Sequence, residues 1–222
     1  MAPTREKSLS EREFELLLEG AGRIEQPTRR LETRAIILIG GRLGLRPGET
    51  THLSSTWVDH DRKMIRVPKH HPCTKGRNGG LCGYCRQAVE QRLRHDPNSE
   101  FADFADYYWV PKTETAARAI PFHFSTRLLV AIDLLIEQHG GWPYSFSTLQ
   151  RRLNTALDLA PELSRESTSL HGLRATAASY HASRGLDLAA LRAMFGWEDI
   201  ETARQYLNVD GAMTRRALNK IH

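Results

Sequence analysis

The sequence has 222 residues, enough to bury one good hydrophobic core, and a single compact domain is expected. Hydrophobic residues make up 40% and charged residues 26% of the chain, which excludes the fibrous, collagen-like and disordered classes. The 31 Lys and Arg residues and the 26 Asp and Glu residues give a formal net charge of +5, which suits a polyanionic partner without requiring one.

The first two predicted elements are helices. Ser10 followed by Glu13 forms a capping box, and the apolar residues after it recur at helical spacing to about Gly20. Thr28 is the predicted cap of a second helix, whose apolar stripe ends at the glycines within residues 40–44. The turn sequence LGLRPGE follows directly.

A small sheet is predicted next. Residues 53–67 alternate apolar and polar side chains around the turn residues 59–61, which indicates a β-hairpin. A third strand is expected within residues 115–122. Between them, residues 70–108 hold all the cysteines, a Gly-Gly pair and a charged stretch, and are interpreted as an insertion that carries one short helix. We refer to residues 70–108 as the insertion.

The remainder of the chain is predicted to be helical, in the segments 125–141, 146–160, 169–185, 187–197, 198–208 and 210–222. The predicted fold class is therefore α+β, mostly helical with a small antiparallel three-stranded sheet. The breaks between segments are too short to be interdomain linkers, so residues 1–222 are expected to form one domain.

No transmembrane or secreted character is predicted. The N-terminal residues lack an apolar signal segment, and the longest apolar run, residues 35–41, is far too short to span a bilayer. Cys73, Cys82 and Cys85 are an odd, clustered set, which argues against an extracellular disulfide framework. We therefore expect a soluble cytoplasmic protein with no membrane partner.

Candidate chemistry rests on four separated pieces: Arg46 in LGLRPGE, Lys112 in WVPKTETAARAIPF, His171 with Arg174 in HGLR, and Tyr206 in ETARQYL. Each is weak alone. His171 and Arg174 are three residues apart near a predicted helix start, so both project from one face beside the helix's positive end, which suits a phosphate. On this spacing alone, a helix whose arginine pairs with solvent or an acid remains the more common alternative.

In their order and spacing, these pieces resemble the catalytic domain of the tyrosine recombinase, or phage integrase, family over residues 9–222. The family's arginine after a Gly-Leu turn, followed three positions later by an acid, corresponds to Arg46 and Glu49. Its His-x-x-Arg motif corresponds to His171 and Arg174.

The later motifs agree as well. The family's lysine lies on a β-hairpin ahead of an Arg-x-x-Pro-like strand, here Lys112 followed by residues 118–121. Its Leu-Gly-His/Trp segment nine residues before the tyrosine corresponds to Phe195, Gly196 and Trp197, followed by Tyr206. Most members have histidine in place of Trp197. The indole N–H can still donate one hydrogen bond, and the ring can equally be a core aromatic.

The resemblance implies a DNA recombinase in which Tyr206 attacks a backbone phosphate and forms a 3′-phosphotyrosyl link. Arg46 and Arg174 would bind the non-bridging oxygens, with Trp197 supporting the phosphate. His171 would take the proton of the tyrosine. The chemistry needs no cofactor.

Two further roles follow from the resemblance. Lys112 would donate a proton to the departing 5′-oxygen. Glu49 would orient Arg46 or His171, and the alternative is a simple carboxylate at a turn or helix end.

The implied partners are double-stranded DNA and other copies of the chain, as a tetramer on DNA. The family usually places a separate helical domain, which clamps the opposite DNA face, before the catalytic one, and this sequence has no room for it. Either DNA binding is then weaker or less selective, or an accessory DNA-binding protein or the insertion is expected to supply the missing contacts. The last predicted helix, residues 210–222, would dock on a neighbouring subunit or pack on the chain's own core.

The insertion contains a candidate metal site. Cys73, Cys82 and Cys85, with His71 or His70, have the residue types and spacing of a Cys3His zinc site, whose role would be structural. A disulfide between two of the cysteines, or reduced thiols in a loop, are the alternatives. Two other functions also remain open: relaxation of supercoils in the manner of type IB topoisomerases, and a DNA-binding regulator of the same fold without recombination activity.

Overall fold

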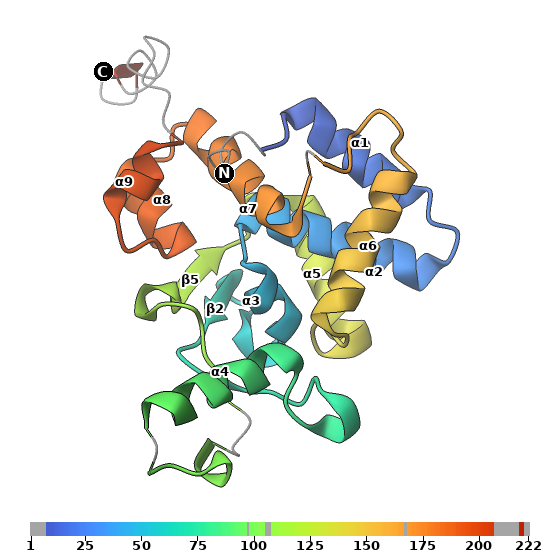
Figure 1. Cartoon of the computed structure of the whole chain (residues 1–222). Coiled ribbons are helices and arrows are strands. Elements are labelled where there is room, and N and C mark those ends of the chain that lie inside the picture. The colour runs from blue at the N-terminus through green and yellow to red at the C-terminus, as the bar shows by residue number, and fades with distance from the viewer. Residues whose placement is uncertain (1–7, 97, 105–107, 167, 207–217, 220–222) are drawn as a thin grey trace.

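The structure is a computed structural model and describes residues 8–96, 98–104, 108–166, 168–206 and 218–219 (Figure 1). Its helices are α1 (Glu11–Gly22), α2 (Pro27–Leu38), the π-helix η2 (Ile39–Leu43), α3 (Pro47–His52), α4 (Gly83–His95), α5 (Thr126–His139), α6 (Phe146–Asp158), α7 (Leu170–Ser183), α8 (Leu188–Phe195) and α9 (Ile200–Arg204). Short 3-10 turns are η3 (Ser55–Trp57), η4 (Arg77–Gly79), η5 (Phe101–Phe104) and η6 (Glu114–Ala116). Most of the helix predicted over residues 210–222 lies outside the described residues.

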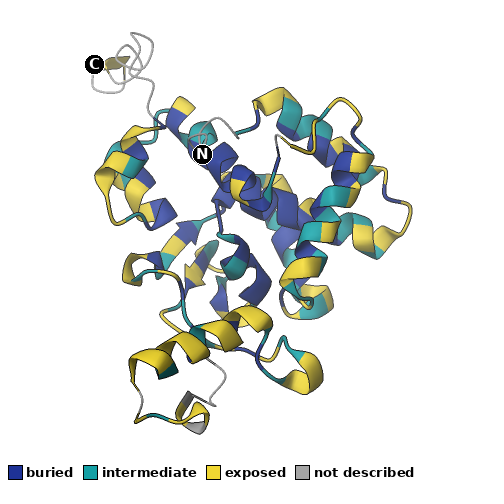
Figure 2. Cartoon of the chain, viewed as in Figure 1, coloured by how far each residue is buried: buried dark blue, intermediate teal, exposed yellow. Residues whose placement is uncertain are grey.

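The helices pack against one another in separate groups. Helix α1 packs on α2 and α6, and α2 also packs on α5 and α6. Helix α7 lies against η2, and α8 packs on the strand β5 (Arg118–Pro121) and on α9. Helix α4 of the insertion lies beside α3, away from α1 and α2 (Figure 1). Figure 2 shows that α7 is largely buried, whereas α4 is mostly exposed.

The predicted three-stranded antiparallel sheet is confirmed. Strand β1 (Val58–Asp59) pairs with β2 (Met64–Val67), and β2 pairs with β5, with Ile65 opposite Ile120. The hairpin is shorter than expected because Ser55–Trp57 forms a 3-10 turn rather than a strand. A second pairing, β3 (His71–Pro72) with β4 (Tyr108–Trp109), closes the base of the insertion and was not predicted.

Local signals set most helix starts. The capping box of Ser10 and Glu13 is confirmed, with the Glu13 carboxylate accepting from the Ser10 amide at 2.7 Å. The predicted cap of α2 is wrong, because Gln26 rather than Thr28 occupies that position and Pro27 starts the helix. Proline is well suited to the first turn, where its missing N–H would have had no helical partner.

The glycine-rich break after α2 brings distant segments together. Helix α2 passes into the π-helix η2, which ends at Gly44 in the left-handed conformation (φ 65°). A Cβ on Gly44 would lie 2.2 Å from a ring carbon of Phe195, so glycine is required both for the backbone and for the close approach. This turn therefore places Arg46 next to the end of α8.

The described part of the chain contains no helix long and apolar enough to cross a membrane.

Candidate functional site

A cleft of about 560 Å³ brings together four of the predicted catalytic residues, Arg46, Glu49, Lys112 and His171. They come from the start of α3, from the segment between β4 and β5, and from the first turn of α7. Helix α4 contributes Tyr84 and Gln87 to the same cleft. The insertion therefore forms part of the wall of the candidate site.

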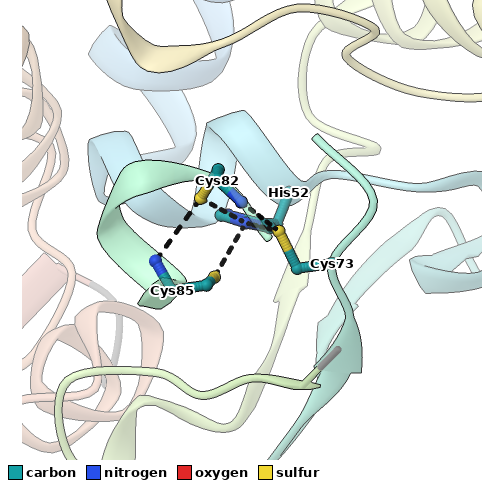
Figure 3. Close-up of side chains that lie close together, drawn as sticks. All are labelled: His52, Cys73, Cys82 and Cys85. Atoms are coloured by element: carbon teal, nitrogen blue, oxygen red, sulfur yellow. Dashed lines mark hydrogen bonds between the residues drawn. The ribbon is translucent and has the colours of Figure 1, made fainter. Parts of the chain in front are cut away.

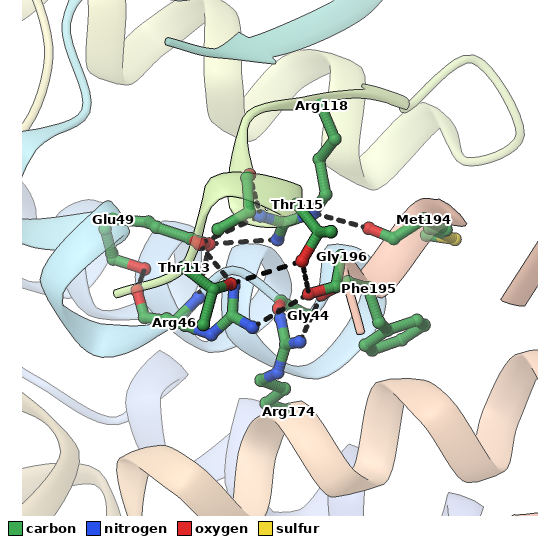
Figure 4. Close-up of polar contacts among 12 residues, drawn as sticks. Gly44, Arg46, Glu49, Thr113, Thr115, Arg118, Arg174, Met194, Phe195 and Gly196 are labelled. Carbon is green, nitrogen blue, oxygen red and sulfur yellow. Dashed lines mark hydrogen bonds and ion pairs between the residues drawn. The ribbon is translucent and has the colours of Figure 1, made fainter. Parts of the chain in front are cut away.

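Arg46 is anchored on both sides of its guanidinium group. It is the residue that caps α3, and its Nη1 donates to Glu49 Oε1 at 3.0 Å while its Nη2 donates to the carbonyl oxygen of Gly196 at 3.0 Å (Figure 4). The Arg46 backbone N–H also donates to Glu49 Oε2 at 2.8 Å. These contacts fix the direction of the side chain before any ligand arrives.

Glu49 joins two arginines, Arg46 and Arg118, and is 1% exposed. Burial by itself would raise the pKa of Glu49, but the charge and hydrogen bonds of Arg118, followed by the charges of Arg174 and Arg46, hold it below its ordinary value. The contacts match both roles expected for Glu49, since it orients the Arg46 side chain and also accepts from the Arg46 backbone N–H at the start of α3. Among the described residues, no hydrogen bond or ion pair joins Glu49 to His171.

Arg118 is a site residue that sequence reasoning placed only in a strand motif. Its Nη1 and Nη2 donate to the two oxygens of Glu49, each at 2.9 Å, and its Nε donates to the carbonyl oxygen of Met194 at 2.7 Å. The side chain thus ties β5 to α3 and to the end of α8 (Figure 4). The signal available in the sequence was the charged residue in an otherwise apolar strand, TAARAIPF.

Arg174 is buried in α7, with 8% of its surface exposed. Its guanidinium donates to the carbonyl oxygens of Gly44 and Phe195 (Figure 4). Burial, followed by the positive charges of Arg46 and Arg118, lowers the pKa of Arg174 to about 9, so it stays charged at neutral pH. The positively charged guanidinium groups of Arg46 and Arg118 therefore lie close enough to Arg174 to lower its pKa.

His171 lies one helical turn before Arg174, and its ring reaches solvent at the cleft. Desolvation by the surrounding protein atoms, followed by the positive charges of Arg174, Lys112 and Arg46, lowers its pKa below the ordinary 6.5. The imidazole is therefore neutral at neutral pH and can accept a proton.

Lys112 lines the cleft, but its local structure differs from the prediction. It was expected on a β-hairpin ahead of the third strand. The strand before it, β4, instead pairs with β3 in the separate two-stranded sheet, and the 3-10 turn η6 separates Lys112 from β5. The reason is the insertion, which interrupts the connection between β2 and β5.

Tyr206 and Trp197 form a stack at the other edge of the site. Their rings are 5.3 Å apart and inclined by only 5°, and Trp197 also stacks on Phe195 at 4.8 Å. The guanidinium carbon of Arg174 lies 5.8 Å from the centre of the Trp197 ring. Tyr206 is 9% exposed and is not among the residues that line the cleft. The structure therefore brings Tyr206 next to Trp197 and Arg174, rather than into the cleft with Lys112.

The cysteines of the insertion converge, but with a different histidine from the one predicted. Cys73, Cys82 and Cys85 surround His52, the last residue of α3, and the potential ligand atoms all lie within 4.8 Å of one another (Figure 3). The structure thus places His52, rather than the predicted His71, with the three cysteines. The His71 ring instead packs edge-on against Trp57, at 5.3 Å.

Replacing Glu49 with alanine is expected to lower the free energy of unfolding by about 3–5 kcal/mol, because it leaves buried arginine charges unpaired. Urea unfolding of the purified chain measures this change. Because the pKa of Glu49 is lower in the folded than in the unfolded protein, its contribution is present above about pH 4.5 and is lost as the pH falls through the folded pKa.

Glu137→Ala provides the control for this substitution, since Glu137 is an exposed glutamate on α5. It should change stability by no more than about 0.5 kcal/mol. Glu49→Gln should flatten the loss of stability in acid. An equal effect of Glu49→Ala and Glu137→Ala would show that the Glu49 ion pairs do not hold the site together.

The site's chemistry is that of an anion-binding centre with a proton acceptor and a phenol beside it. Guanidinium groups bind phosphate oxygens through paired charge-assisted hydrogen bonds. Among the described residues that line the cleft, Glu49 is the only acid, and its charge is already engaged by arginines. The arrangement therefore favours a phosphate group in the cleft.

Comparisons with known proteins agree with this geometry. Residues 7–213 match the model of the phage integrase family. The structure of the Tn1549 transposon integrase in complex with a circular intermediate DNA is similar, with a TM-score of 0.66, 17% identity, and coverage of 99% of this chain and 67% of that one.

Two recombinases show the same fold. XerA recombinase has a TM-score of 0.57 and 16% identity, and the match covers 97% of this chain and 63% of XerA. XerH bound to its difH substrate has a TM-score of 0.59 and 18% identity, and the match covers 96% of this chain and 53% of XerH. This chain thus spans about half to two thirds of those proteins. No curated protein matches the sequence. The family match over residues 7–213, together with this fold, shows that the chain belongs to the phage integrase family of tyrosine recombinases.

Proposed function

We propose that the chain is the catalytic domain of a site-specific DNA recombinase that cuts and rejoins DNA through a 3′-phosphotyrosyl intermediate. The observation that carries this proposal is the convergence of Arg46, Lys112 and His171 on one cleft, from three segments far apart in the sequence. Family membership supports it, as do the similar proteins, which include an integrase and a recombinase bound to DNA.

In the proposed cleavage step, the Tyr206 phenolate oxygen attacks the phosphorus of a DNA backbone phosphate. The bond from phosphorus to the 5′-oxygen breaks, and a phosphotyrosyl bond forms. His171 accepts the phenol proton, since its lowered pKa keeps the ring in the neutral form that can accept, and Lys112 donates a proton to the leaving 5′-oxygen. Rejoining reverses these transfers with the 5′-hydroxyl of another strand.

The phosphate is held by Arg46 and Arg174 in this proposal. Each guanidinium carries five N–H donors in a rigid fork, so contacts with backbone carbonyls leave further donors for phosphate oxygens. The contacts with Gly196, Gly44 and Phe195 fix both forks in advance. Preorganised donors of this kind stabilise the charge that develops in the transition state.

Tyr206 has to reach the phosphate that these arginines hold. In the structure it stacks on Trp197, whose ring lies near the Arg174 guanidinium. We infer that DNA binding brings the phosphate and the phenol together at the edge of this stack, with the Trp197 indole N–H as an additional donor to the phosphate. The stack keeps the phenol ring oriented until then.

The phosphotyrosyl bond conserves the energy of the broken phosphodiester, so the proposed reaction needs neither ATP nor another cofactor. A zinc ion in the His52 cluster would have a structural role. Double-stranded DNA is the proposed substrate, bound by a tetramer of the chain inside the cell, with an accessory DNA-binding protein as a further proposed partner.

A plasmid assay tests this function against its two rivals. A supercoiled plasmid carrying two copies of the DNA that flanks the gene is incubated with the protein, and the products are separated by gel electrophoresis. We expect recombinant circles, and none with Tyr206→Phe. Relaxed topoisomers without recombinants would indicate a topoisomerase. Gel-shifted but unaltered plasmid would indicate a DNA-binding regulator.

A further inference from the structure

We propose that His52, Cys73, Cys82 and Cys85 bind one zinc ion, and that this ion fastens the insertion to helix α3. The four residues come from three segments: the end of α3, the chain after β3, and the start of α4. The proposal concerns the architecture of the chain and does not depend on the proposed DNA chemistry.

The three nitrogen–sulfur distances within the cluster fit a tetrahedral ion. His52 Nε2 lies 3.3 Å from Cys73 Sγ, 3.7 Å from Cys82 Sγ and 3.4 Å from Cys85 Sγ (Figure 3). A zinc ion with usual bond lengths, ~2.0 Å to nitrogen and ~2.3 Å to sulfur, separates such ligands by about 3.5 Å. The three nitrogen–sulfur distances are therefore those expected along the edges of one coordination tetrahedron.

The hydrogen bond on the other side of the ring sets the tautomer of a neutral His52. Its Nδ1 lies 2.8 Å from the carbonyl oxygen of Gly48, and a carbonyl oxygen only accepts, so Nδ1 carries the proton. In the neutral ring, Nε2 then presents a lone pair to three sulfur atoms. A cation shared by this nitrogen and the three sulfur atoms would satisfy all four atoms at once. Metal-bound histidines are oriented by the same type of contact.

Backbone amides point at the sulfur atoms. The N–H of Cys82 donates to Cys73 Sγ at 3.5 Å, and the N–H of Cys85 donates to Cys82 Sγ at 3.5 Å. Cys82 also caps the start of α4, where the helix favours negative charge. Both effects stabilise thiolates, the form of cysteine that binds metals.

The cluster is mostly buried and packs against an aromatic ring. His52, Cys73 and Cys85 are buried, and the His52 ring stacks on Trp109 with centres 5.2 Å apart. None of the three cysteines is in a disulfide. Four nitrogen and sulfur ligands in a closed tetrahedral set are typical of structural zinc rather than of a catalytic metal, which keeps an open position.

The ion would connect the insertion to the candidate active site. Helix α3 begins beside Arg46 and ends at His52, while α4 begins at the two cysteines of the CGYC sequence. Both helices line the cleft that contains Arg46. Only Cys85 and Val89 of α4 are buried, so apolar packing alone holds this helix weakly. A bound zinc ion would attach α4 to α3 more firmly.

The metal content of the purified full chain tests the proposal. Mass spectrometry of the metals is expected to find one zinc ion per chain, and none after Cys85→Ser or His52→Ala. His71→Ala is the matched control, because His71 is a nearby histidine outside the cluster, and it should retain zinc. Loss of zinc in the His71 variant with retention in the His52 variant would overturn the assigned ligand set.

A second measurement keeps the proposal testable where a cysteine variant fails to fold. Cobalt added to the wild-type chain after chelation should give the thiolate-to-cobalt charge-transfer absorption of a tetrahedral site. Chelation should also speed tryptic cleavage at the arginines of α4, and added zinc should reverse this. Metal-free protein with three reactive thiols or with a disulfide, and no cobalt absorption, would overturn the proposal.

Discussion

Replacing Arg174 with lysine is expected to slow DNA strand cleavage by about 10²–10³-fold, the usual effect of removing one preorganised donor from a transition-state site. Arg174 spans two backbone carbonyls, those of Gly44 and Phe195, with one planar group. A lysine ammonium is compact and cannot match both acceptors and a phosphate oxygen in the same geometry. Single-turnover cleavage of a radiolabelled duplex measures the change.

Arg127→Lys is the control for this substitution, because Arg127 is an exposed arginine that pairs with Glu15 on the surface. It should cleave at the wild-type rate. Arg174 is buried, so the unfolding midpoint and the DNA affinity of the lysine variant have to be measured alongside. Cleavage at the wild-type rate by folded, DNA-bound Arg174→Lys would contradict a role for the guanidinium in the reaction.

Local sequence signals were sufficient for much of the fold. The capping box at Ser10 and Glu13 depends on residues three positions apart, and the β1–β2 hairpin depends on a short alternating run; both are present in the structure. The cap of α2 shows the limit of such signals, because Thr28 and Gln26 both offer a side-chain acceptor. Pro27 decides between them, since its ring is well placed at the first helical position.

Long-range contacts explain what the sequence did not predict. Arg118 pairs with Glu49 across 69 positions, through the β2–β5 pairing that brings β5 towards α3. His52 approaches Cys85 across 33 positions, only after the insertion folds back on α3. His71 was the more natural choice by spacing, because it lies two residues from Cys73. No spacing rule connects a histidine at a helix end with a cluster of this kind.

The resemblance to a family located the candidate site, but not its present geometry. Arg46, Lys112 and His171 meet in the cleft, whereas Tyr206 is stacked on Trp197 beside it. A sequence motif gives the order of residues along the chain and carries no information about which of them line a cleft and which lie beside it. The stack of Tyr206 on Trp197 therefore had to come from the structure.

Covalent trapping tests the role of Tyr206 most directly. The substrates are duplexes from the DNA that flanks the gene, and each carries a nick so that the cleaved end is lost. They are incubated with the chain after a gel shift has confirmed binding. The phosphotyrosyl product should resist SDS, and mass spectrometry should place the nucleotide on the peptide that contains Tyr206. Tyr206→Phe removes only the phenol oxygen and keeps the ring that stacks on Trp197.

We predict an SDS-resistant adduct with the wild-type chain and none with Tyr206→Phe, at equal DNA binding. An adduct that persists in the phenylalanine variant would place the nucleophile elsewhere, and bound DNA without any adduct would contradict strand cleavage by this chain.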